Sequence, residues 1–362
     1  MTETPHPLLP ATTPVTRPDE HTVQVGGADG RDGVRVWPAG PEVARLLTGI
    51  DGRRTERALR GDWSAAGLDD DVVEDLLAGL RGAGLLREVT AGDLLATDPG
   101  PAAAARAGLE LPTVAAGRWR TRRQSSVVVE GATRVGTPLA GLLAASGVGR
   151  VSVRDRGLTT AGEPVVGGVA AHDEGRPRVL AAADAIRRAS PLTDLRPLPA
   201  TQRPDLVLLC RPWAAVDPLT AALQRDGVPH LVATVRGDTG VVGPLVLPGV
   251  TSCLRCADGW RREDDPSWPA TAAQLATARP APAGSTLTCL ATAVTAAVQA
   301  LAHLDGGDCA PGVLDAALEL GPPTFQPRLR RWPPHPGCGC GARQEGVAER
   351  EVAAERGQWG GE

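Results

Sequence analysis

The sequence predicts a two-part α/β protein, in which a doubly wound, mostly parallel sheet follows a small winged-helix domain. From about residue 124, apolar runs alternate with helical patterns, as in sheets covered by helices on both faces. Residues 1–95 instead show two short strand patterns followed by three helical ones. With 362 residues, of which 42% are hydrophobic and 22% charged, the chain can form two domains with separate cores.

Composition excludes several classes of function. The net charge is −4, so we expect neither a general nucleic-acid binder nor a membrane-surface protein. All 38 basic residues are Arg, which leaves no lysine for phosphate binding or Schiff-base chemistry. The first residues lack a basic, apolar targeting pattern, and the longest apolar stretch, from Cys289, is too short and polar to span a bilayer. We therefore expect a cytoplasmic protein.

The N-terminal domain, predicted over residues 1–95, begins with a hairpin. HTVQVGG (21–27) and GVRVW (33–37) have strand patterns, and turn-forming residues lie between them. Apolar residues at helical spacing and terminal glycines then predict three helices. The elements expected after the hairpin are helices at 41–52, 54–61 and 69–86, with a last strand, GLLREV, at 84–89.

Residues 96–123 are rich in Ala, Pro and Gly and are predicted to be a linker. The second domain is predicted over 124–341, and a charged, Gly-rich tail over 342–362. Continuous apolar runs give its buried strands. The expected strands are SSVVVEG (125–131), RVSVRD (150–155), TDLRPLP (193–199), PDLVLLC (204–210) and PHLVATVRG (229–237), with helices at 132–149, 176–191 and 213–227.

Two closely spaced cysteine pairs form the most specific motif. Cys253 and Cys256 are three residues apart, and Cys338 and Cys340 are two apart near the C-terminus. Zn²⁺ takes four soft ligands in a tetrahedron, and four cysteines leave no position open for water. We therefore expect a structural zinc site, with a redox-active dithiol as the alternative. The remaining cysteines are expected to pack as small apolar side chains: Cys210, Cys289 and Cys309.

GATRVG, residues 131–136, lies between a buried strand and a helix, where a dinucleotide or ATP fingerprint would lie. Only Gly131 and Gly136 of the glycine pattern are present, while Thr133 and Arg134 occupy positions where backbone must approach phosphate closely. Arg134 could bind phosphate or fill the space, and a strand-turn-helix without nucleotide is the other interpretation. Asp155 ends the next strand, where it suits a ribose hydroxyl or a helix cap.

With these motifs, residues 124–341 resemble the ThiF-type (MoeB-like, ubiquitin-activating) family. The run CLRCADGWRREDDPSWP, 253–269, is most similar to a narrower branch. Members of that branch bind the leader peptide for cyclodehydratases that form azoline rings in thiazole/oxazole-modified microcins, a class of RiPP biosynthesis. The resemblance implies a Rossmann-like ThiF-type domain, with zinc held by the four paired cysteines, preceded by a winged-helix leader-recognition domain.

Departures from the adenylating members of the family concern the nucleotide. Those members use a glycine-richer loop, a phosphate-binding Lys, and an Asp after the fourth strand that holds Mg²⁺. Here Arg178 falls where the Lys is expected, and Arg211 and Pro212 stand where the Asp is expected. Arg does not replace Lys as a point charge, and Mg²⁺ prefers carboxylate oxygens. We therefore expect weak ATP and Mg²⁺ binding without turnover; the cofactor-binding candidates are Gly131, Arg134, Gly136, Asp155 and Arg178.

The favoured function is a non-catalytic scaffold that binds a precursor (leader) peptide and presents it to a partner modifying enzyme. The peptide would add a strand to the hairpin edge, with its side chains in a groove beside Val72, Val73, Leu76 and Leu77. Cover of this edge by the second domain or by a second copy, as a homodimer, is the alternative. An ATP-dependent adenylyltransferase acting on a peptide or protein carboxylate is the runner-up function. A DNA-binding winged helix is disfavoured because 62–75 would present acids to phosphate.

Overall fold

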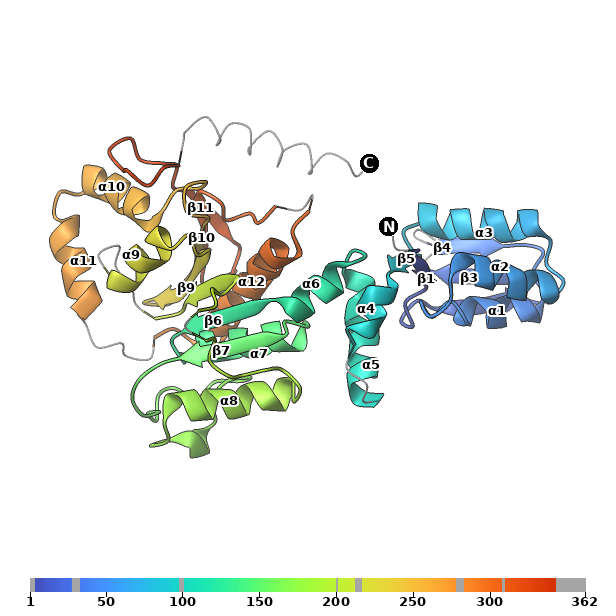
Figure 1. Cartoon of the computed structure of the whole chain (residues 1–362), viewed down its shortest axis with the longest axis horizontal. Coiled ribbons are helices and arrows are strands. Elements are labelled where there is room, and N and C mark those ends of the chain that lie inside the picture. The colour runs from blue at the N-terminus through green and yellow to red at the C-terminus, as the bar shows by residue number, and fades with distance from the viewer. Residues whose placement is uncertain are drawn as a thin grey trace. The chain divides into compact units, whose positions relative to one another are not determined.

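The computed structural model describes residues 4–27, 33–97, 101–199, 201–211, 217–277, 283–307 and 310–342, without the side chains of 101–104 and 275–277. The chain forms two compact units, Met1–Arg123 and Gln124–Glu362 (Figure 1).

The N-terminal unit contains the predicted hairpin. β3 (Thr22–Gly26) pairs antiparallel with β4 (Gly33–Val36), and the predicted turn lies largely outside the described residues. A strand that the sequence did not predict, β2 (Val15–Asp19), pairs with the other edge of β3. Its sequence, VTRPD, is polar and contains Pro18, a residue that sheets tolerate on edge strands. The meander therefore leaves β2 and β4 as its two edges.

The last predicted strand forms, but in another place. β5 (Arg87–Val89) pairs antiparallel with β1 (His6–Leu8) in a separate two-stranded sheet and not with the hairpin. The three predicted helices pack their apolar faces around Trp63, which is 1% exposed. The winged-helix assignment stays a prediction. These helices are α1 (Pro41–Thr48), α2 (Glu56–Ala65) and α3 (Asp70–Gly82).

Helices occupy most of the stretch that was predicted to be a linker, 96–123. The buried Asp93 carboxylate accepts hydrogen bonds from the backbone N–H of Gly117 at 2.6 Å and of Arg120 at 3.0 Å. It thereby fixes the start of the last of these helices to α4 (Ala91–Leu95), the helix that carries Asp93. The elements of this stretch are α5 (Pro101–Glu110), the 3₁₀ helix η1 (Leu111–Thr113) and α6 (Arg118–Gln124), and α4 lies just before it.

The second unit is a mixed α/β structure built on one large sheet, with strand order β12-β11-β10-β9-β8-β6-β7. Its parallel strands confirm the predicted alternation, and three antiparallel strands extend it at one side. The parallel strands are β6 (Ser126–Glu130), β7 (Arg150–Arg154), β8 (Leu206–Leu209) and β9 (His230–Arg236); the antiparallel ones are β10 (Thr239–Val246), β11 (Ala316–Leu320) and β12 (Arg328–Arg331).

One predicted strand was wrong. TDLRPLP, 193–199, makes only an isolated parallel bridge between Asp194 and Arg150. Pro197 and Pro199 supply no backbone N–H for a ladder. The Asp194 side chain instead accepts hydrogen bonds from Arg150 and Arg196.

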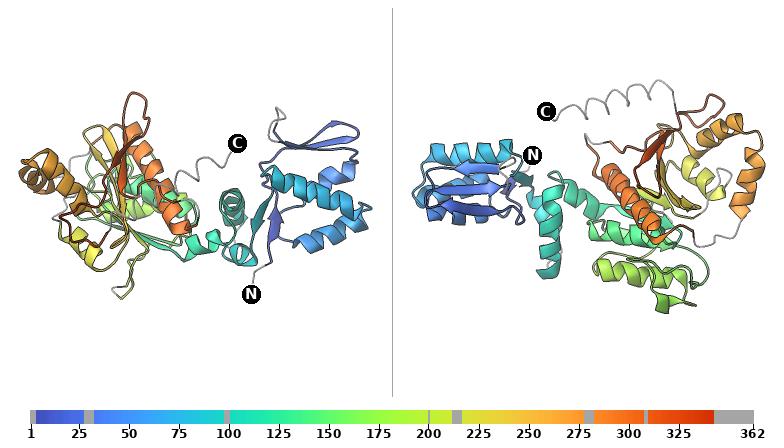
Figure 2. Two further views of the ribbon diagram at one scale, coloured as in Figure 1. Left: turned by 90° about the horizontal axis from the view of Figure 1, so that it is seen from above. Right: turned by 180° about the vertical axis from the view of Figure 1, so that it is seen from behind.

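Both faces of the sheet are buried by helices, as the apolar strands predicted. Val127 and Val129 face one core with α7, α8 and α12, whereas Val128 faces the other with α9 and α10. Figure 2 shows α7, α8 and α12 side by side on their face. The helices are α7 (Gly136–Ala145), η2 (Ala171–Asp173), α8 (Arg178–Ala189), α9 (Pro218–Arg225), α10 (Leu254–Asp264), α11 (Trp268–Thr277) and α12 (Thr286–Asp305).

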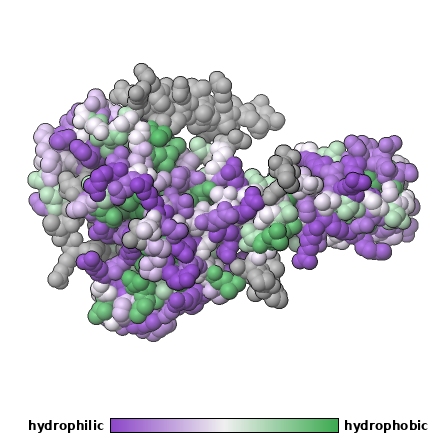
Figure 3. Space-filling model, viewed as in Figure 1, coloured by the Kyte–Doolittle hydropathy of each residue, from purple (hydrophilic) through white to green (hydrophobic). Residues whose placement is uncertain are grey.

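Within the described residues, α12 alone has the length and apolarity of a membrane span, with a mean hydropathy of 1.6. In this structure, 44% of its most apolar window is buried, so it is also a core helix of the second unit. On the face seen in Figure 3, apolar side chains form small patches among hydrophilic ones.

Candidate functional site

The turn from β6 into α7 needs both of its glycines. Gly131 has a φ of +115°, which L side chains rarely adopt. A Cβ on Gly136 would lie 2.0 Å from the carbonyl oxygen of Gly131. The two glycines predicted from GATRVG therefore have a structural reason that does not depend on a ligand.

Two backbone amides at the end of this turn, those of Val135 and Gly136, are satisfied by the chain itself. The Thr133 hydroxyl accepts hydrogen bonds from the N–H of Val135 at 3.3 Å and of Gly136 at 3.0 Å, and donates to the Cys210 carbonyl at 3.0 Å. These N–H groups begin α7, where a phosphate would otherwise be bound. In the sequence Thr133 only interrupts the glycine pattern, and this capping depends on the path of the turn.

Arg134 reaches across to the start of α12. Its Nη1 donates to the Gly284 carbonyl at 2.5 Å, and its Nη2 donates to the Thr286 hydroxyl at 3.0 Å. The Nε is buried without a hydrogen-bond partner in the described part of the chain. Arg134 was predicted either to bind phosphate or to fill the space of the loop, and this placement supports the second role.

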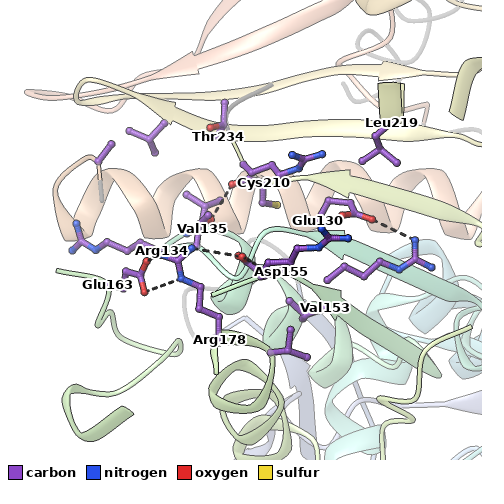
Figure 4. A pocket seen from close by; sticks show the side chains of 17 residues that line it. Glu130, Arg134, Val135, Val153, Asp155, Glu163, Arg178, Cys210, Leu219 and Thr234 are labelled. Carbon is purple, nitrogen blue, oxygen red and sulfur yellow. Dashed lines mark hydrogen bonds and ion pairs between the residues drawn. The ribbon is translucent and has the colours of Figure 1, made fainter. Parts of the chain in front are cut away.

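Asp155 and Arg178 lie together, as members of one network (Figure 4). Asp155 accepts hydrogen bonds from the N–H of Ala132 at 2.7 Å and of Arg156 at 2.6 Å, and its carboxylate lies 3.6 Å from Nη1 of Arg178. Arg178 also pairs with Glu163, whose side chain is 8% exposed. Asp155 thus ties β7 to the β6–α7 turn and is not the cap of a helix. Glu163 was missed because nothing local in the sequence links it to Arg178.

These side chains line a cavity of about 880 Å³. It lies at the carboxyl ends of β6, β7 and β8, where the strand order reverses and ligands of such sheets bind. Burial raises the pKa of Glu130 at the end of β6. Arginines outnumber carboxylates in the lining, which favours an anionic ligand: Arg134, Arg154, Arg156, Arg178 and Arg211 against Glu130, Asp155 and Glu163.

No spare carboxylate follows β8 in the described residues. Arg211 pairs with Asp217, at 3.2 Å between Nη2 and Oδ2. The other oxygen of Asp217 caps α9 by accepting from the N–H of Leu219 at 2.9 Å. Pro212 lies outside the described residues. Asp217 therefore already has structural partners at the place where a Mg²⁺ ligand would be needed.

The four paired cysteines converge on one point. Cys253 precedes α10 and Cys256 lies on its first turn, while Cys338 and Cys340 follow β12. Their sulfurs are 3.9 Å (253 to 256), 3.7 Å (253 to 338) and 3.5 Å (256 to 340) apart, and all four lie within 4.8 Å of one another. A tetrahedron with Zn–S bonds of about 2.3 Å has edges of roughly 3.8 Å. The cluster therefore fits a four-cysteine metal site.

The chemistry of the cluster agrees with its geometry. The hydrogen bond from the Cys253 thiol lowers the pKa of Cys256 to about 5, and the same bond raises the pKa of Cys253. Four converging thiols favour a metal over a redox dithiol, which needs two. Cys210 and Cys289 are buried, as predicted for packing residues, and Cys309 lies outside the described residues.

His335 positions the second cysteine pair. Its carbonyl accepts from the N–H of Cys338 at 2.9 Å, its Nδ1 accepts from the N–H of Gly337 at 3.1 Å, and its Nε2 lies 2.9 Å from Glu263 on α10. A Cβ on Gly259 of α10 would lie 2.7 Å from this ring. His335 was not predicted as a site residue, because only the cysteines of HPGCGCG have the spacing of metal ligands.

The peptide groove predicted in the N-terminal unit is mostly closed. Val73, Leu76 and Leu77 are buried in the core, whereas Val72 is 46% exposed. β2 covers the outer edge of β3, so within the described residues the unpaired edge of the predicted hairpin is that of β4.

The model of the ThiF family matches residues 107–340. The chain belongs to the ThiF family. The ThiF-type resemblance expected from the sequence is thereby confirmed, whereas the narrower azoline-forming branch stays a prediction. A comparison with curated proteins gave no match.

Solved structures similar to this ThiF-family chain agree on the fold. One is Escherichia coli MccB with ATP, with 15% identity and a TM-score of 0.59 over 93% of this chain and 99% of that one. Another is the microcin C7 biosynthetic enzyme MccB in complex with N-formylated MccA, with 14% identity and a TM-score of 0.58 over the same shares. PaaA matches with 17% identity and a TM-score of 0.52 over 88% and 98%. At these identities the likeness shows the fold alone.

Proposed function

We propose that this chain is a non-catalytic ThiF-like scaffold. Its N-terminal unit binds a precursor peptide, and the chain presents that peptide to a partner modifying enzyme. A structural zinc ion held by Cys253, Cys256, Cys338 and Cys340 joins α10 to the C-terminal segment. The partner enzyme predicted from the sequence resemblance is a cyclodehydratase that forms azoline rings.

The non-catalytic part of the proposal rests on the β6–α7 turn, where side chains of the protein itself bind three backbone amides. The Thr133 hydroxyl occupies the N–H groups of Val135 and Gly136, and Asp155 occupies that of Ala132. A nucleotide phosphate would have to displace these bonds, and it would find no free carboxylate after β8 to hold its Mg²⁺ in the described residues. A chain that binds a peptide without activating it leaves the chemistry to another protein.

The peptide-binding part is supported by the free edge of β4. β2 is a poor partner for a further strand, because it carries Arg17, Pro18 and Asp19. β4 instead places the half-buried side chains of Val34 and Val36 beside α3. An extended peptide can add to such an edge through main-chain hydrogen bonds. Support also comes from the fold of MccB, a solved structure of which contains the N-formylated peptide MccA.

Binding of candidate precursor peptides tests the proposal. Fluorescein-labelled peptides encoded beside the gene are titrated against the full chain by anisotropy, followed by hydrogen exchange of the complex. We expect protection of amides 33–36 of β4 with no change at 15–19 of β2, and an unaltered peptide mass after incubation with ATP and Mg²⁺. Absence of binding, or protection outside β4, contradicts the scaffold.

An ATP-dependent adenylyltransferase is the second candidate. The cavity at the ends of β6, β7 and β8 favours it, because its volume of about 880 Å³ is ample for a nucleotide and its lining is rich in Arg. The buried Nε of Arg134 also lacks a partner in the described residues. Equilibrium dialysis with ATP, with and without Mg²⁺, separates the candidates: tight binding that requires Mg²⁺ supports the enzyme.

A further inference from the structure

β12 (Arg328–Arg331) forms one edge of the large sheet, and no strand in the described residues pairs with its outer side. Its sequence is RLRR, and all four residues are exposed. It contains neither a proline nor a carboxylate, in contrast to β2, where Pro18 and Asp19 oppose further pairing. Backbone N–H and C=O groups of such an edge can pair with an added strand. β12 therefore presents an unpaired edge of uniformly positive charge.

The side chains of β12 divide between the two faces of the sheet. In the pairing with β11, Arg330 lies opposite Ala317 and Leu329 lies opposite Leu318. Ala317 belongs to the core beside α10, and Leu318 packs against the core beside α12. Because successive side chains of a strand alternate, the even-numbered residues of β12 share the α10 face and the odd-numbered ones share the α12 face.

An aromatic support holds the arginines of the α10 face. The ring of Trp332, which directly follows β12, is 4% exposed. The guanidinium carbons of Arg261 and Arg330 lie 4.5 Å and 4.4 Å from its centroid, within cation–π distance. Arg261 on α10 also lies 5.0 Å from the ring of Trp268. These contacts give a structural role to the Arg and Trp residues of CLRCADGWRREDDPSWP, 253–269, which the cysteine cluster does not use.

Positive charge exceeds negative charge around Arg330. Glu319 of β11 lies 3.8 Å from Arg330, and Arg328 makes no ion pair with the part of the chain that the structure describes. Burial lowers the pKa of Arg261, and the charge of Arg330 lowers it further, whereas Asp258 opposes both effects. A carboxylate brought to this face therefore meets an attraction that the chain itself satisfies only in part.

We propose that the occupant of the β12 edge is an acidic strand of the partner modifying enzyme, an inference that rests on the proposed scaffold function. Directly opposite side chains interact across a ladder, so a strand that matches Arg-Leu-Arg-Arg carries acid, apolar, acid and acid in turn. Charges on an edge strand exclude strands of ordinary composition. The same arginines thereby select an acidic partner.

Other occupants fit less well. The chain's own C-terminal stretch, 343–362, has five Glu, but Arg343, Arg350 and Arg356 lie among them and no two of its acids are adjacent. Single-stranded nucleic acid stacks its bases on exposed aromatic rings, whereas Trp332 is buried and β12 has no aromatic residue.

A synthetic probe tests the chemistry of the edge. The probe is a fluorescein-labelled peptide that repeats Glu-Glu-Val-Glu, and a peptide with Gln for each Glu is its uncharged counterpart. In anisotropy titrations of the full chain we expect only the acidic probe to bind, with an affinity that falls as salt rises. Hydrogen exchange should show protection of amides 328–331 and no change at 33–36 of β4. Equal binding of the Gln peptide, or protection at 33–36 instead, overturns the proposal.

Arg328→Glu is the variant to compare, because Arg328 is exposed. It should weaken binding of the probe about tenfold, since like charges then lie opposite each other. Arg203→Glu, at an exposed arginine before β8, is the matched control and should bind like the unaltered chain. A chain that ends at Ala342 should also bind equally. If its amides 328–331 exchange faster than those of the full chain, the C-terminal stretch covers the edge and the proposal is overturned.

The modifying enzyme encoded beside the gene separates this inference from the scaffold function itself. We expect it to bind the full chain and to lose about tenfold in affinity for Arg328→Glu, while the precursor peptide binds that variant unchanged. Circular dichroism confirms that each variant is folded. An enzyme that binds the variant as tightly as the unaltered chain overturns the role of the β12 edge alone. An enzyme that does not bind the chain at all overturns both proposals.

Discussion

The Thr133 hydroxyl receives the two amide hydrogens at the start of α7 that a bound phosphate would take in a nucleotide site. Asp155 likewise binds the Ala132 amide. Of the residues in these contacts, the sequence identified only Gly136 and Asp155 as candidates for nucleotide binding. The identity of Thr133 is visible in the sequence, but the partner of its hydroxyl depends on the path of the turn.

Replacing Thr133 tests this at the level of one hydroxyl. Thr133→Ala removes the acceptor for two amides, so we expect a loss of about 1–2 kcal/mol in stability. The freed amides should also increase ATP binding in equilibrium dialysis. Thr133→Ser keeps the hydroxyl and serves as the control. An Ala variant that matches the Ser variant in thermal midpoint and in ATP binding contradicts the capping role.

His335 allows a second test, at the cysteine cluster. His335→Ala removes the ring that accepts from Gly337 and contacts Glu263. Groups that position metal ligands typically contribute 10–100-fold to metal affinity, so we expect about that loss in a competition titration of zinc with a chromogenic chelator. His172→Ala, at a side chain 75% exposed, is the control. Equal zinc retention by both variants argues against positioning by His335.

Among the helices and strands, the sequence predicted those whose residues follow a clear local pattern. The buried strands β6 to β9 and the β3–β4 hairpin follow from apolar runs and turn formers. β2 was missed because an exposed edge strand needs no apolar alternation. The prolines of TDLRPLP outweighed its strand pattern. Helices between 101 and 124 were hidden by an Ala, Pro and Gly composition, and Asp93 fixes them through long-range bonds that composition does not show.

Asp194 shows how the irregular segment after α8 is held, and it gives a pH prediction. Hydrogen bonds from Arg196 and then Arg150 lower the pKa of Asp194. Because the folded pKa lies below the unfolded value of about 3.9, the stabilisation is present above that pH and declines as the pH falls below it. Asp194→Asn should therefore lower the thermal midpoint at pH 7 by more than at pH 2.5. A difference that stays constant across this range contradicts the assignment.

The whole molecule combines the β4 edge in one unit, which we propose binds a peptide, with a cavity and a cysteine cluster in the other. The sequence was enough to predict that the four cysteines come together, because two closely spaced pairs suit a tetrahedral metal ion. The sequence predicted less of the cavity lining, because the ion pair between Glu163 and Arg178 forms only in the folded chain. Binding of a peptide without its activation is the function that we propose for the two units together.

ATP–pyrophosphate exchange tests directly whether the chain binds a peptide without adenylating it. Zinc-loaded full-length chain is incubated with ATP, Mg²⁺, labelled pyrophosphate and a peptide that it binds, since adenylation of any carboxylate is reversible and labels ATP. We expect no exchange above the protein-free blank, because the amides of Ala132, Val135 and Gly136 at the β6–α7 turn are occupied and Asp217 is paired with Arg211. Exchange that depends on the peptide and is abolished by Asp155→Ala would contradict it and establish an adenylyltransferase.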